Sequence, residues 1–219
     1  MIETIENGVQ LVVCGFCSIV CFVLAYRLKE KEWDILALFY AAISLGDLYW
    51  QLYTIFNSEV PQLSYISEFA YYAAYLFLLL LMRYVVGEKA THYFHPILWL
   101  ILPFVIGMCI FYMRWGDYLA NMITAFLMGM LMWHSLRGLL YFRKVGAEED
   151  EEEGDRHSLQ VNTRFCAVVF LLCIIEYTMW TVSCFNSELS ITNPYYIFDF
   201  MFTLCMAVFL PLFGKAVKA

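Results

Sequence analysis

The hydrophobic positions of the chain fall into seven long runs that are separated by short polar segments. Each run has about 20 residues, the length that an α-helix needs to cross the hydrocarbon core of a bilayer. The runs are continuous and do not alternate between apolar and polar residues, so they predict helices and not the strands of a membrane β-barrel. We therefore predict an all-α polytopic membrane protein. Its seven expected transmembrane helices are residues 9–27, 33–56, 63–83, 94–113, 118–142, 161–185 and 194–213.

The composition supports this interpretation and removes several others. Hydrophobic residues make up 63% of the 219 residues, charged residues 15%, and the mean hydropathy is +0.68. A soluble domain has about 25% charged residues, so this chain could not cover a soluble surface. The net charge of -7 also excludes a nucleic-acid-binding protein, which needs a basic face. We expect one domain, residues 1–219, surrounded by the lipid bilayer.

The basic residues predict the orientation of the helices. When the segments between the expected helices are numbered from the N-terminus, 12 of the 13 Lys and Arg residues fall on one side of the membrane. Only Arg114 falls on the other side. Because basic residues concentrate on the cytoplasmic side, we expect the N-terminus outside and the C-terminus in the cytoplasm.

The segment between the fifth and sixth expected helices carries seven of the 20 acidic residues. Like charges in a run repel one another and stay solvated, so we expect a flexible cytoplasmic loop at about 144–159. A docking site for a basic partner or a divalent cation is the alternative, although the run lacks the alternating ligands and the glycine of a calcium-binding loop. The acidic residues of the run are Glu148, Glu149, Asp150, Glu151, Glu152, Glu153 and Asp155.

Four acidic side chains lie inside the expected helices, where an ionisable group is costly and is by default a candidate for function. These acids are Asp47, Glu68, Glu176 and Asp199. Counted from the expected helix ends, all four lie in the outer half of the membrane. Polar and aromatic residues recur beside them at helical spacing, so these faces should point into the bundle. On the third helix, Tyr71 and Tyr72 fit this spacing equally well. The candidate ligand-binding residues are Asp47, Glu68, Tyr72, Tyr75, Glu176, Trp180, Tyr195 and Asp199.

Two interpretations of these residues are open. In the first, Asp47, Glu176 and Asp199 join helices through hydrogen bonds to tyrosine hydroxyls. In the second, the acids and rings form an outward-facing pocket for protons or for a small cationic or amine-bearing ligand, which the carboxylates would attract by charge and the rings by cation–π interaction. We predict no metal or cofactor, because zinc needs three or four converging ligands and His134 stands alone in its helix. No nucleophile is paired with a base at a recognisable spacing, which disfavours an enzyme.

Several motifs follow one another along the second and third expected helices: SLGDLYW at 44–50, VPQL at 60–63 and SEFAYYAAY at 67–75. They resemble the seven-helix input modules that precede diguanylate-cyclase domains in bacterial sensors, and NPYYIFD at 193–199 is similar to a helix start in the same modules. The resemblance implies a sensor or receptor-like protein in a bacterial cytoplasmic membrane. Asp47, Trp50, Glu68 and Tyr71 would occupy the motif positions, with Glu68 where those modules usually have Asp. Because the chain ends just past the last helix, we expect a signal to pass to a separate protein.

Two alternative functions are open as well. The SLGD motif at 44–47 also resembles lysoplasmalogenase-like membrane hydrolases, which would make Asp47 and Asp199 catalytic in lipid hydrolysis. That family has a helix rich in Gly and containing His at the next position, whereas residues 64–83 contain neither. A transporter of a small solute is the other alternative, although clear internal repeats and broken helices are not evident.

Overall fold

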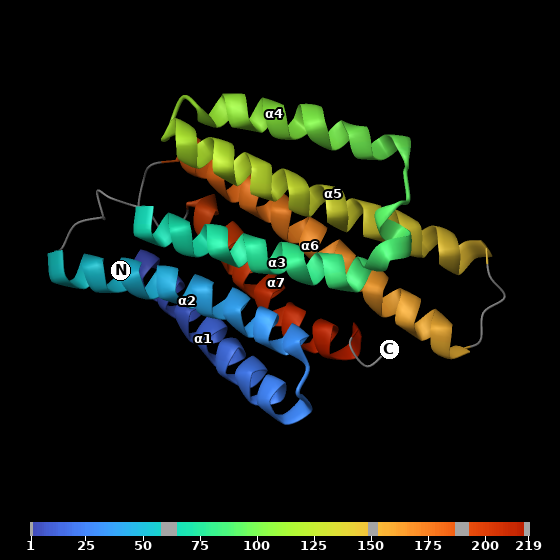
Figure 1. Cartoon of the computed structure of the whole chain (residues 1–219). Coiled ribbons are helices and arrows are strands. Elements are labelled where there is room, and N and C mark those ends of the chain that lie inside the picture. The colour runs from blue at the N-terminus through green and yellow to red at the C-terminus, as the bar shows by residue number, and fades with distance from the viewer. Residues whose placement is uncertain (1, 58–64, 149–152, 187–192, 217–219) are drawn as a thin grey trace. The chain divides into compact units, whose positions relative to one another are not determined.

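The computed structural model describes residues 2–57, 65–148, 153–186 and 193–216. Within these residues all regular structure is helical (Figure 1). The all-α fold class predicted from the hydrophobic runs is thus confirmed. The elements are α1 (Ile2–Leu28), α2 (Lys31–Asn57), α3 (Tyr65–Thr91), the 3₁₀-helix η1 (Pro96–Leu100), α4 (Ile101–Tyr112), α5 (Tyr118–Glu148), α6 (Glu153–Phe185) and α7 (Pro194–Ala216).

Six described helices are long and apolar enough to cross a membrane, namely α1, α2, α3, α5, α6 and α7. The chain therefore has the helices of a polytopic integral membrane protein. The fourth predicted segment is divided between η1 and α4, which together cover only Pro96–Tyr112. At about 2.0 Å per residue in η1 and 1.5 Å in α4, the two together extend roughly 28 Å, close to the hydrocarbon thickness of about 30 Å.

Polar side chains mark the starts of α5 and α7. Asp117 accepts the backbone N–H of Ala120 at 2.9 Å through Oδ1. Asn193 likewise accepts the N–H of Tyr195 at 3.0 Å, and Pro194 follows it as the first residue of α7. These side chains satisfy amide groups that have no partner within the helix, so both helices begin where the sequence supplies a cap.

Helix α3 bends near its C-terminal end, at Gly87. This residue has φ 69° and ψ 174°, a backbone region that is essentially open only to glycine. The chain then makes one more turn, in which the Thr91 hydroxyl donates to the Gly87 carbonyl oxygen at 2.7 Å. The helical segment therefore continues past the predicted end at residue 83, with a change of direction that hydropathy alone does not reveal.

The described residues group into two units. The first unit comprises Met1–Leu78 and Ile175–Ala207, and the second comprises Leu79–Ile174 and Val208–Ala219. Helices α3, α6 and α7 contribute residues to both units. Each unit is therefore described by itself.

In the first unit, α1 and α2 run side by side as a hairpin (Figure 1). Its turn contains Lys29, which has a positive φ of 58°. The Ser18 hydroxyl donates to the Ala37 carbonyl oxygen at 3.0 Å, and the Gln51 amide donates to the Thr4 carbonyl oxygen at 2.8 Å. Small polar side chains that bond across helices are a common means of association inside membranes, where the hydrophobic effect between helices is absent.

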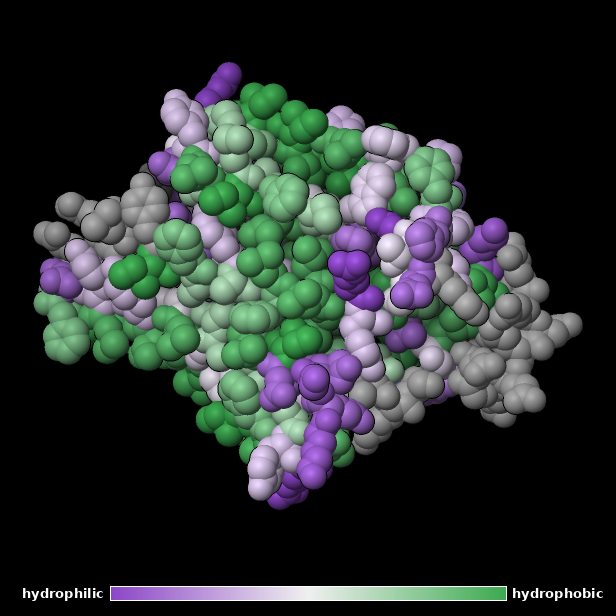
Figure 2. Space-filling view, viewed as in Figure 1, coloured by the Kyte–Doolittle hydropathy of each residue, from purple (hydrophilic) through white to green (hydrophobic). Residues whose placement is uncertain are grey.

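The two faces of α1 differ in exposure and in side-chain type. Val12, Phe16 and Ile19 are 69%, 65% and 65% exposed, whereas Cys14 and Ser18 on the opposite face are buried. Large apolar side chains are exposed elsewhere on the surface as well (Figure 2). An exposed apolar face of this extent is unfavourable in water and suits contact with lipid.

In the second unit, Gly138 of α5 permits a close approach between helices. A Cβ added there would lie 2.6 Å from the Cys166 sulfur of α6 and 2.9 Å from a methyl group of Val86 of α3. The rings of Phe165 and Phe209 pack 5.7 Å apart between α6 and α7. Close backbone contact at a glycine and ring packing thus hold these helices together.

Helix occupies both ends of the acidic segment that we predicted as a flexible loop at about 144–159. Helix α5 continues to Glu148, and α6 begins at Glu153. Residues 149–152 lie outside the described residues, so the flexibility of the loop stays a prediction.

Candidate functional site

The first predicted acid, Asp47 of α2, is 1% exposed and reaches across to α3. The Tyr71 hydroxyl donates to its Oδ1 at 2.6 Å. The neighbouring Gly46 makes this contact possible, because a Cβ there would lie 3.3 Å from the Ala70 Cβ and 3.5 Å from the Ser67 carbonyl oxygen. The Gly-Asp pair thus combines a close approach of two helices with a buried carboxyl group at the point of contact.

The second acid, Glu176 of α6, is 6% exposed and accepts two hydrogen bonds on one oxygen. The Tyr75 hydroxyl of α3 donates to Oε1 at 2.6 Å, and the Trp180 indole N–H donates to the same oxygen at 3.0 Å. Tyr71 and Tyr75 are one helical turn apart. Helix α3 therefore donates one hydroxyl to an acid of α2 and another to an acid of α6.

The third acid, Asp199 of α7, is 4% exposed and lies one turn after Tyr195. Its Oδ2 is buried and has no hydrogen-bond partner in the described part of the chain. No described side chain donates to its carboxyl group, in contrast to Asp47 and Glu176. Of the three predicted acids that are buried, Asp199 therefore contributes least to holding the helices together.

Each of these three predicted acids keeps one carboxyl oxygen without a hydrogen-bond partner among the described residues. Besides Asp199, both Asp47 and Glu176 have a second carboxyl oxygen, Oδ2 and Oε2, that is buried and lacks a partner among the described residues. An unsatisfied buried polar group costs about 1–3 kcal/mol, and more when it is charged. Such oxygens can accept an amine N–H, bind a cation or carry a proton, and each of these would reduce the cost.

Tyr71 connects the groups of this site, all of which lie in the first unit. Besides its hydrogen bond to Asp47, it lies close enough to Tyr75 and Tyr195 to interact with them electrostatically. Helix α3 thus bonds to the acids of α2 and α6, and Tyr195 of α7 lies within electrostatic range of Tyr71. This arrangement combines the two interpretations of the sequence, since Asp47 and Glu176 accept hydrogen bonds from tyrosine hydroxyls while all three acids keep an unsatisfied oxygen.

The other predicted residues lie at the margins of this site. Glu68 is half-buried, unlike the three other acids. Tyr72 is also half-buried, and its ring meets the exposed ring of Phe69 edge-on at 6.1 Å. Trp180 is 49% exposed, and the Tyr195 ring contacts Tyr196 at 5.6 Å.

Sequence reasoning missed two polar groups of the first unit. Glu6 and Gln10 of α1 are buried. Hydropathy placed the start of the first helix at residue 9, after the charged Glu6, and Gln10 lay inside the predicted helix but was not named as a candidate. Their spacing of four residues, the same period that identified the other polar faces, could have included them.

Metal-ligand chemistry finds no support in the described residues, where no group of three or more His, Cys, Asp or Glu side chains could hold an ion. All eight cysteines are free. Two cavities in the second unit are lined by none of the eight predicted residues. The candidate site therefore offers the chemistry of carboxyl, phenol and indole groups.

Comparisons with known proteins gave no match. No protein-family model matches the chain. No curated protein and no solved structure matches it either. The resemblances to sensor input modules and to membrane hydrolases stay predictions, and the function has to be argued from the residues.

Proposed function

We propose that this chain is a membrane sensor or receptor-like protein whose ligand is a small cation, an amine-bearing molecule or the proton. One observation carries the proposal. Three buried carboxyl groups on three helices, those of Asp47, Glu176 and Asp199, each keep an oxygen without a hydrogen-bond partner in the described structure. A ligand that occupies such an oxygen relieves a cost of about 1–3 kcal/mol, and this free energy is available to drive a change in the protein.

The aromatic residues favour a positively charged ligand. Tyr75 and Trp180 both bond to Glu176, and half of the Trp180 side chain is exposed. The face of an aromatic ring attracts a cation within about 6 Å, most strongly for tryptophan. Carboxyl oxygens and ring faces together would distinguish an amine or a small cation from an anion.

The proposed response of the protein runs through α3. Tyr71 and Tyr75 donate to acids of two different helices. Hydrogen bonds to an ionised acceptor are roughly twice as strong as those between neutral groups, so neutralising Asp47 or Glu176 would weaken the tie between α3 and its neighbour. A ligand or proton would thereby shift the balance between two packings of α3.

The proposal includes an orientation and a place in the cell. The distribution of basic residues supports an outer N-terminus and a cytoplasmic C-terminus, with η1 and α4 as a further crossing. The resemblance to bacterial input modules supports the bacterial cytoplasmic membrane. The acids would then face the outside, and the cytoplasmic loop at 147–155 and the C-terminus would pass the change to a separate signalling protein.

Replacing Asp199 tests the proposal, because Asp199→Asn removes a charge without removing a hydrogen bond between described side chains. The purified protein in lipid nanodiscs would be titrated with sodium, ethylammonium and tetramethylammonium ions and with acid, and tryptophan fluorescence would be recorded. We expect a saturable response to at least one of these. In Asp199→Asn the apparent affinity should fall by about ten-fold, which corresponds to about 1.4 kcal/mol.

The matched control is Asp34→Asn, which removes the same charge from an exposed position of α2. This variant should respond like the unmodified protein. The sensor proposal is wrong if the unmodified protein shows no saturable response, or if Asp199→Asn alters thermal stability and leaves the response unchanged. In the latter case the buried acids serve only to join helices.

A further inference from the structure

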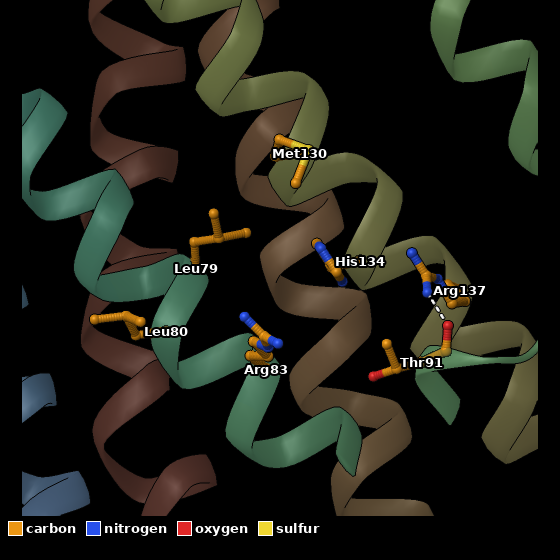
Figure 3. Close-up of a pocket in the computed structure, with 7 residues that line it drawn as sticks. All are labelled: Leu79, Leu80, Arg83, Thr91, Met130, His134 and Arg137. Carbon is orange, nitrogen blue, oxygen red and sulfur yellow. Dashed lines mark hydrogen bonds between the residues drawn. The ribbon is translucent and has the colours of Figure 1, made fainter. Parts of the chain in front are cut away.

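Two adjoining cavities lie in the second unit. The first has a volume of about 300 Å³ and lies between α3 and α5 (Figure 3). The second has a volume of about 570 Å³ and lies between α5 and the segment formed by η1 and α4. Met130, His134 and Arg137 line both cavities. These residues recur at the spacing of one helix face, so the two cavities meet along α5.

The first cavity gathers nitrogen groups that have no anionic partner. Arg83 of α3 and His134 of α5 line the same space, beside Arg137 (Figure 3). Arg137 donates one N–H to the Thr91 carbonyl oxygen, and its guanidinium stands 5.8 Å from the centre of the Trp133 ring. The Nε of Arg137 and the Nδ1 of His134 are buried and lack hydrogen-bond partners within the described residues.

No carboxylate pairs with Arg83, His134 or Arg137 in the parts of the chain that the structure describes. Arg137 lies six residues before Arg143 along α5, or about 9 Å deeper in the bundle. The Thr91 carbonyl accepts one N–H of Arg137 but supplies no counter-charge, and a charge without a counter-ion is costly within a membrane helix. The cavity therefore favours an anion, and arginine offers the paired donors that suit phosphate.

The second cavity differs in character, since its wall is mostly apolar. Val105 and Ile106 of α4 and Phe126 of α5 line it, and the last two are exposed at the surface of the unit. Gly129 keeps the two helices close, because a Cβ added there would lie 3.2 Å from a methyl group of Val105. The volume falls in the usual range of about 300–1,000 Å³ for ligand sites. This groove suits a hydrocarbon chain.

We propose that the two cavities together bind one anionic phospholipid, with its phosphate at Arg83 and Arg137 and an acyl chain in the groove between α4 and α5. The cationic cavity alone would suit any phosphate, whereas the adjoining apolar groove selects a lipid. Basic pockets between membrane helices are known sites for anionic headgroups on the cytoplasmic side. This site uses none of the buried acids of the first unit, so it stands independently of the proposed sensor function.

The experiment counts lipids bound to the purified protein by native mass spectrometry. Detergent-solubilised protein would be titrated with long-chain phosphatidylglycerol, with phosphatidylcholine, with glycerol phosphate and with inorganic phosphate. We expect one tightly retained phosphatidylglycerol, with at least about five-fold weaker binding of each other probe. Equal binding of phosphatidylcholine would overturn the headgroup assignment, and equal binding of glycerol phosphate or inorganic phosphate would overturn the lipid assignment.

Arg83→Gln is the informative variant, because Arg83 makes no hydrogen bond within the described structure. Its replacement therefore leaves the hydrogen bonds of the described residues intact. We expect Arg83→Gln and Arg137→Gln each to weaken phosphatidylglycerol binding by at least about five-fold. Arg143→Gln, which removes an exposed charge outside the cavities on the same helix, is the matched control and should bind as before. Equal losses in Arg83→Gln and Arg143→Gln would mean that only general surface charge attracts the lipid, and the proposal would be wrong.

Discussion

Tyr71 and Asp47 form the clearest single contact of the candidate site. The hydroxyl donates at 2.6 Å to a carboxyl group that is almost fully buried. The sequence predicted the buried acid, because a charged residue in an apolar helix rarely faces lipid. The spacing fitted Tyr71 and Tyr72 equally, because adjacent helical residues point only about 100° apart, and the candidate ligand-binding set took Tyr72 and left out Tyr71, whose hydroxyl bonds to Asp47.

Removing the Tyr71 hydroxyl should therefore destabilise the protein. In Tyr71→Phe the Asp47 Oδ1 loses its donor, and we expect a loss of about 1–3 kcal/mol in the free energy of unfolding. Equilibrium unfolding in mixed micelles would measure it. Tyr26→Phe, at an exposed position of α1, removes the same atom and should cost less than about 0.5 kcal/mol. Equal effects of the two substitutions would contradict the role of the Tyr71 bond.

At the scale of the helices, hydropathy predicted the existence of the elements better than their ends. The fifth and sixth predicted helices stop at 142 and start at 161, whereas α5 continues to Glu148 and α6 begins at Glu153. An apolar run marks only the part of a helix that lies in lipid. The helical backbone can continue beyond it into polar sequence, so α5 and α6 are longer than predicted. The fourth predicted helix, 94–113, differs from the structure in another way. Its first part, from Pro96, forms the 3₁₀-helix η1, and the α-helix α4 begins only at Ile101.

The packing of α5 depends on Gly138, which no hydropathy pattern singles out. An alanine Cβ would meet the Cys166 sulfur at 2.6 Å and Val86 at 2.9 Å. We expect Gly138→Ala to lower the free energy of unfolding by about 1–3 kcal/mol, because overpacking forces the helices apart.

The matched control for this substitution is Gly107→Ala in α4, where an added Cβ meets nothing within 4 Å. Alanine favours helix over glycine by up to about 1 kcal/mol, so this variant should be as stable as the unmodified protein or more so. Thermal unfolding in the same micelles compares the two. A Gly138→Ala protein that is as stable as Gly107→Ala would show that α5 and α6 adjust without cost.

For the whole molecule, the number of crossings decides whether the two termini lie on the same side of the membrane. Among the described residues, six helices have the length and hydropathy of a membrane span, and η1 with α4 is a further, shorter candidate. With seven crossings the termini lie on opposite sides, and with six they lie on the same side. The sequence predicted the class of protein because composition is a property of the whole chain. It could not predict which helices pair, because lipid-facing and helix-facing apolar positions have the same composition.

Reporter fusions would test the proposed orientation. We expect green fluorescent protein at the C-terminus to fluoresce, since it folds on the cytoplasmic side, and alkaline phosphatase there to be inactive. The same reporters at the N-terminus, with a leader suited to export, should give the reverse result. A fusion after Lys29, in the first basic segment, is the internal control and should report the cytoplasm. Termini on the same side would mean that η1 and α4 do not cross.

Gly87 turns the end of α3 so that the Thr91 carbonyl meets Arg137. The guanidinium is thereby held in one orientation before any ligand arrives. Immobilising such a side chain during binding costs about 0.5–1.5 kcal/mol, and here folding has already met that cost. An anion at Arg137 would gain roughly two- to ten-fold in affinity as a result. The conformation of one glycine thus fixes in advance a cationic group of the proposed lipid site.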